Sequence, residues 1–83
     1  MLFLVELKYA YEHREEVLRF FWEHGATRYQ GSVALKGAWV ATQERIVYAL
    51  VEAADADEIA QAGEPLAQFG TLTIRQVTSV EDI

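Results

Sequence analysis

The ionisable residues best placed to do chemistry interrupt apolar segments of the chain. Four of them stand out: Glu6, Lys8, Glu52 and Arg75. Two carboxylates on one partly buried surface perturb each other's pKa and can act as acid and base, while an arginine beside them can bind a substrate carboxylate. The alternatives are an ion-pair network between two copies of the chain and simple exposure to solvent. We favour the network, with Glu6, Glu52 and Arg75 kept as candidate ligand-binding residues.

The two histidines are too far apart to share a metal ion. His13 and His24 fall on one edge of an expected helix, but eleven residues of helix separate them by about 16 Å. We interpret His13 as a solvated or capping residue and His24 as a cation favoured by the end of the helix dipole. A role for either as an intersubunit or haem-type ligand stays open. We expect no metal site and no cofactor.

Aromatic residues supply the remaining candidates for a ligand site. Trp39 lies in the middle of an expected strand, where a sheet covered by helices needs large side chains, so we expect it in the core. Tyr29 and Arg28 lie in a stretch without periodicity and are candidates for the rim or lid of a site, with a plain surface loop as the alternative. Tyr29 and Trp39 complete the set of candidate ligand-binding residues.

Composition limits the classes of function. Thirteen acidic residues against seven basic ones give a net charge of −6, which disfavours nucleic acid as a partner. The apolar start of the chain reaches Glu6 and Lys8 before a signal sequence or membrane span is complete, so we expect a cytoplasmic protein. The absence of cysteine excludes disulfides, thiolate zinc sites and cysteine nucleophiles.

Hydrophobic periodicity predicts four strands and two helices. The expected order is a strand at Leu2 to Tyr9, a helix from about His13 to His24, a hairpin at Val33 to Ala41 and Arg45 to Ala53, a helix after Asp55, and a strand at Thr71 to Val80. Gly25 is expected to end the first helix, and Ala26 to Ser32 to form a loop. Asp55 is expected to cap the second helix, which is interrupted near Gly63 and Pro65.

This order predicts one α+β domain over residues 1–83. Strand, helix, hairpin, helix and strand form the ferredoxin-like β-α-β-β-α-β sandwich, a four-stranded antiparallel sheet with two helices on one face. Leu2 and Leu4 then lie on the face that no helix covers. Because such a face is usually covered by another copy, we expect a homodimer.

Several short motifs resemble one bacterial family. They are Glu12-His13-Arg14, Arg19-Phe20, Gly25, Gly31-Ser32-Val33, Leu35-Lys36-Gly37-Ala38-Trp39 and Ala49-Leu50-Val51-Glu52-Ala53. The chain resembles short proteins classed as a domain of unknown function within the dimeric α+β barrel superfamily. That resemblance implies a dimeric α+β barrel with ligands between sheet and helices. Members of the superfamily include monooxygenases acting on haem or quinone-like substrates, muconolactone isomerase-like enzymes and modules without known activity.

Two functions therefore remain open. The favoured one is a non-catalytic homodimeric module that binds a small apolar or aromatic molecule, or only itself. The alternative is a cofactor-independent monooxygenase or isomerase-like enzyme that uses Glu6, Glu52, Arg75 and the histidines. A cavity between sheet and helices that contains at least two of these polar groups would favour the enzyme.

Overall fold

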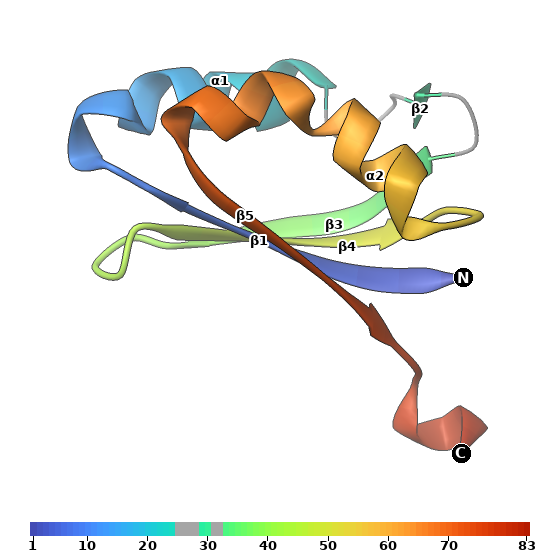
Figure 1. Cartoon of the computed structure of the whole chain (residues 1–83). Helices are drawn as coiled ribbons and strands as arrows, with labels where there is room; N and C mark the ends of the chain where they lie inside the picture. The colour runs from blue at the N-terminus through green and yellow to red at the C-terminus, as the bar shows by residue number, and fades with distance from the viewer. Residues whose placement is uncertain (25–28, 31–32) are drawn as a thin grey trace.

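Strands and helices follow one another in the predicted order (Figure 1). The structure is a computed structural model and describes residues 1–24, 29–30 and 33–83. The strands are β1 (Leu2–Tyr9), β2 (Tyr29–Gln30), β3 (Val33–Ala41), β4 (Ile46–Glu52) and β5 (Gly70–Val77). The helices are α1 (Arg14–His24) and α2 (Ala56–Ala62), and short 3₁₀ segments are η1 (Tyr11–His13), η2 (Glu64–Phe69) and η3 (Val80–Asp82). The prediction of an α+β, ferredoxin-like fold is confirmed.

The strands form one antiparallel sheet in the order β2-β3-β4-β1-β5. The first and third long strands are neighbours and form the β1–β4 pair, as the ferredoxin-like order requires. β2 is an addition at the edge, where Tyr29 and Gln30 pair with β3 and satisfy part of its backbone. The prediction of a loop is wrong for these two residues. Its remaining positions, and the predicted helix stop at Gly25, lie outside the described residues.

Alternation along β1 divides its side chains between two environments. Phe3, Val5, Leu7 and Tyr9 are all buried, whereas the residues between them are half-buried or exposed. Figure 1 shows why: α1, α2 and η2 all lie on one side of the sheet. We call the other side, which none of these helices covers, the open face. The prediction that both helices share one face is confirmed.

The core lies between the sheet and the helix layer as two adjoining clusters. One gathers around Val5, Val51 and Ile59, and the other around Leu7 and Val17, which are the largest fully buried side chains. Phe21 packs against both clusters and so links them. The core is therefore continuous beneath α1 but is supplied by few residues of each helix.

The second helix begins and ends as its sequence predicts. The Asp55 carboxylate accepts a hydrogen bond of 3.0 Å from the backbone N–H of Glu58, which caps α2. The helix stops at Ala62, and Gly63 links it to η2, which has Pro65 in its first turn. Proline fits there because it has no N–H to donate to a preceding turn.

The last strand is shorter than predicted because it runs out of partner. Val77 pairs with Leu2, the first residue of β1, so no ladder remains for residues 78–80. The chain instead forms η3 beyond the sheet.

Trp39 corrects the sequence analysis. It lies opposite Tyr48 on the open face and its side chain is 60% exposed, so it is not part of the core. A Cβ atom at Gly37 would stand 2.8 Å from the Trp39 ring, which shows that the indole lies across the strand over that glycine. The wrong inference came from counting positions in a strand without knowing which face the helices cover.

Candidate functional site

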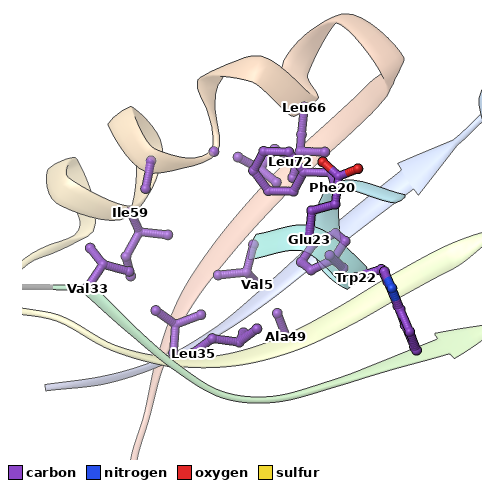
Figure 2. Close-up of a pocket in the computed structure, with 14 residues that line it drawn as sticks. Val5, Phe20, Trp22, Glu23, Val33, Leu35, Ala49, Ile59, Leu66 and Leu72 are labelled. Atoms are coloured by element: carbon purple, nitrogen blue, oxygen red, sulfur yellow. The ribbon is translucent and has the colours of Figure 1, made fainter. Parts of the chain in front are cut away.

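A cavity of about 650 Å³ lies between the sheet and the helix layer (Figure 2). All four long strands, α1, α2 and η2 contribute to its wall. The described residues that line it are Val5, Phe20, Phe21, Trp22, Glu23, Val33, Leu35, Ala49, Val51, Ile59, Ala62, Gly63, Leu66 and Leu72. Figure 2 shows Ile59 and Leu66 reaching from the helix layer toward Val5 and Ala49 of the sheet.

Small residues explain why side chains leave this space open. Ala49 lies at the centre of β4 on the helix side, and Ala62 and Gly63 end α2 directly above the cavity. Ala49 and Ala62 would need to be larger residues for the layer to close at the density usual in protein interiors. Gly63 is held close to the sheet, since a Cβ there would lie 3.1 Å from Leu72 Cδ2.

The wall of the cavity is mainly apolar. Among its described lining residues only Glu23, near the end of α1, carries a charge. Trp22 stands at the margin, with its side chain 88% exposed. Such a wall supplies apolar contact and shape, with one carboxylate at the rim for orientation.

The open face holds the polar residues that the sequence analysis selected. Arg75 donates a hydrogen bond to the Glu6 carboxylate across the β1–β5 pair, and the two form an ion pair. The Glu6 side chain is 21% exposed and that of Arg75 62%. Lys8, two residues further along β1, lies exposed on the same face. The structure thus brings Glu6 and Arg75 together within one copy.

Glu52 does not join this pair. It lies opposite Leu2, whereas Glu6 lies opposite Tyr48, four residues away along β4. At roughly 3.3 Å per residue the two carboxylates are separated by about 13 Å along the sheet. Glu6 and Glu52 share a face, but they do not form a carboxylate pair.

The remaining candidates are also dispersed. Tyr29 lies in the edge strand β2, and Arg28 lies outside the described residues. His13 Nδ1 lies 3.2 Å from Glu16 Oε2, and its ring packs 5.3 Å from that of Phe69. These contacts agree with a local structural role for His13. In the described part of the chain no three acidic or histidine side chains gather as a metal site would require.

Sequence reasoning missed the residues that form the cavity. It looked for ionisable groups, and these lie on the opposite face. The available signal was the small size of Ala49 and Ala62 on the buried sides of a strand and a helix. Alanines at such positions are common in cores. They indicate a cavity only when no larger side chain from the opposite layer fills the space beside them.

Comparison with known proteins identifies a family and no characterised relative. A search of curated proteins and a search of solved structures each found no match to this sequence. Among the described residues, no helix is long and apolar enough to cross a membrane. A family model described as a domain of unknown function, DUF3303, matches residues 1–83, and the chain therefore belongs to that family.

Proposed function

We propose that this chain is a non-catalytic homodimeric module that binds one small apolar or aromatic molecule between its sheet and its helix layer. The observation that carries the proposal is the cavity of about 650 Å³ with its apolar wall. Small-molecule sites in proteins commonly measure about 300 to 1,000 Å³ and are lined mainly by apolar and aromatic side chains.

The distribution of ionisable groups supports binding over catalysis. Acid–base chemistry needs at least two polar groups within reach of one substrate. Glu6, Arg75 and Glu52 all lie on the open face, across the sheet from the cavity. The described wall offers Glu23 as its one ionisable side chain, which favours a module over a monooxygenase or isomerase-like enzyme.

The homodimer part of the proposal is supported by the open face. Exposed Trp39 lies opposite half-buried Tyr48 there, and half-buried Leu50 and Leu4 lie two residues further along β4 and β1. Uncovered apolar side chains on one face mark interaction sites. We propose that two copies pack sheet to sheet, as in the dimeric α+β barrel superfamily. The acidic composition leads us to propose that nucleic acid is not a partner. We also propose a cytoplasmic location, because Glu6 and Lys8 interrupt the apolar segment of β1.

A neutral fluorescent probe, N-phenyl-1-naphthylamine, tests the cavity. Its emission rises when it leaves water, so titration into the chain measures binding directly. Ala62→Leu adds side-chain volume inside the cavity, while Ala60→Leu adds the same volume to the exposed side of the same helix. We expect Ala62→Leu to weaken probe binding by about tenfold or more and Ala60→Leu to leave it unchanged.

Circular dichroism and urea unfolding of both variants verify that they remain folded. Equal probe binding by the two variants would place the probe elsewhere on the surface. Absence of binding by the unmodified chain would remove the apolar ligand from the proposal.

A further inference from the structure

Residues 78–83 follow β5 as an exposed segment that contains the 3₁₀ turn η3. We call residues 78–83 the arm. Ser79 Oγ accepts a hydrogen bond of 3.3 Å from the Glu81 N–H, and the Asp82 N–H donates one of 2.9 Å to the Ser79 carbonyl. These bonds hold η3 in shape, although every residue of the arm is exposed. Figure 1 shows the arm beyond the end of the sheet, on the side away from the helices.

The arm presents two apolar residues on one side. Val80 is 83% exposed and Ile83 is 93% exposed, the latter being the highest value among the exposed large apolar residues. In a 3₁₀ turn, residues three apart lie above one another, so these two side chains share a side. Between them lie two acidic residues, Glu81 and Asp82. The arm therefore presents a small apolar surface next to two acidic side chains.

The open face has the complementary character. Next to its β5 edge, its apolar part includes half-buried Leu4, and the cations there are Arg75 and Lys8. The Arg75 side chain is 62% exposed although it pairs with Glu6, so part of its guanidinium still faces outward. The arm thus carries apolar side chains and negative charges, and this face carries apolar side chains and positive charges.

We propose that the arm of one copy lies on the open face of a second copy, with Val80 and Ile83 on its apolar part and Glu81 and Asp82 near Lys8 and Arg75. This inference rests on the homodimer of the proposed function. A two-fold axis makes the exchange reciprocal, so each copy both gives and receives an arm. The arm's own sheet is not the acceptor, because its residues remain exposed in the single chain.

Disulfide trapping tests the contact, because the chain contains no cysteine and any introduced thiols are the only ones. One copy carries Ile83→Cys, and a second copy of different mass, enlarged by a tag, carries Thr73→Cys in the edge strand β5, on the open face two residues from Arg75. After mixing and mild oxidation we expect a covalent product with the mass of one copy of each kind. Ile83→Cys mixed with Ala60→Cys, on the outer side of α2, serves as the matched control. Equal trapping in both mixtures would overturn the inference.

Dimer dissociation constants give an independent readout. We expect a chain ending at Val77 to dissociate at least about tenfold more readily than the full chain. Glu81→Lys should weaken the dimer by about two- to fivefold, and adding Lys8→Glu to that variant should restore part of the loss.

The outcomes separate the two proposals. Unchanged dissociation by the shortened chain, with the full chain dimeric, would overturn the arm contact and leave the homodimer standing. A full chain that sediments as a single copy at every concentration tested would overturn both.

Discussion

The two faces of the sheet differ in how far their apolar residues are covered by the rest of the chain. Toward the helices, β1 buries Leu7 and its neighbours in a core that borders a cavity open to solvent. Toward the open face, the same strand places half-buried Leu4 beside the Glu6–Arg75 pair. One face is thus covered but incompletely filled, and the other is well provided with apolar residues but uncovered. This difference underlies our proposal that the first face binds a small molecule and the second binds another copy of the chain.

Leu7 and Leu4 offer the strongest test of this difference, since they are the same residue type on one strand. Leu7→Ala should lower the free energy of unfolding by about 2–5 kcal/mol, because Leu7 is 1% exposed and the change leaves a void. Leu4→Ala should cost less in the single chain. Its cost should grow with protein concentration, because association of two copies contributes to the measured stability. Urea unfolding at low and high protein concentration measures both effects.

Equal losses for the two variants, independent of concentration, would mean that the two faces are not energetically distinct. The same experiment on the unmodified chain supplies the reference for concentration dependence.

Trp39 tests whether the open face is an interface. Trp39→Glu should raise the dimer dissociation constant by about 30-fold or more, because a large exposed aromatic is the expected centre of binding energy and the two new charges would repel across a two-fold axis. Sedimentation equilibrium measures the constant. Ala60→Glu, which places the same charge on the outer side of α2, should leave it unchanged. A Trp39→Glu chain that still dimerises normally would exclude this face as the interface.

Asp55 tests the helix layer alone. Asp55→Ala removes the carboxylate that caps α2 and should lower the free energy of unfolding by about 1 kcal/mol. Since α2 forms one wall of the cavity, probe binding should also weaken, whereas the dimer dissociation constant should not move. Thermal unfolding and a probe titration measure these effects. A change confined to dimerisation would contradict the separation of the faces.

The Glu6–Arg75 pair should show the smallest effect. Glu6→Gln removes one charge from a pair whose arginine is largely exposed, so the free energy of unfolding should change by about 0–1 kcal/mol. Probe binding should stay as it was, because the pair lies across the sheet from the cavity. A loss of probe binding as large as that expected for Ala62→Leu would contradict this prediction and would mean that Glu6 contributes to ligand binding.

Local sequence signals predicted the elements because each signal acts within a few residues. Alternation fixed the faces of β1, and Asp55 and Pro65 fixed the start and the interruption of the second helical segment. The end of β5 was placed wrongly since it depends on where β1 begins, seventy-five residues earlier in the pair Leu2–Val77. Trp39 was misplaced for a similar reason, as its environment depends on the position of both helices.

The candidate site was harder to predict than the fold. Glu6 and Arg75 were recognised because ionisable residues in apolar strands are conspicuous, and they do meet. Their distance from Glu52 depends on the register of β1 against β4, which no local pattern specifies. The cavity exists because no large side chain fills the space opposite Ala49, and this can be recognised only once the sheet and the helix layer are assembled.

We propose that the cavity binds a ligand and that the open face binds a second copy, each independently of the other. The most direct measurement is a titration of N-phenyl-1-naphthylamine into the Trp39→Glu chain at a concentration where sedimentation shows single copies. We expect this monomeric chain to bind the probe within about twofold of the unmodified dimer, since sites on opposite faces of a sheet act additively. Loss of probe binding on dissociation would contradict the account, because the ligand site would then require the second copy.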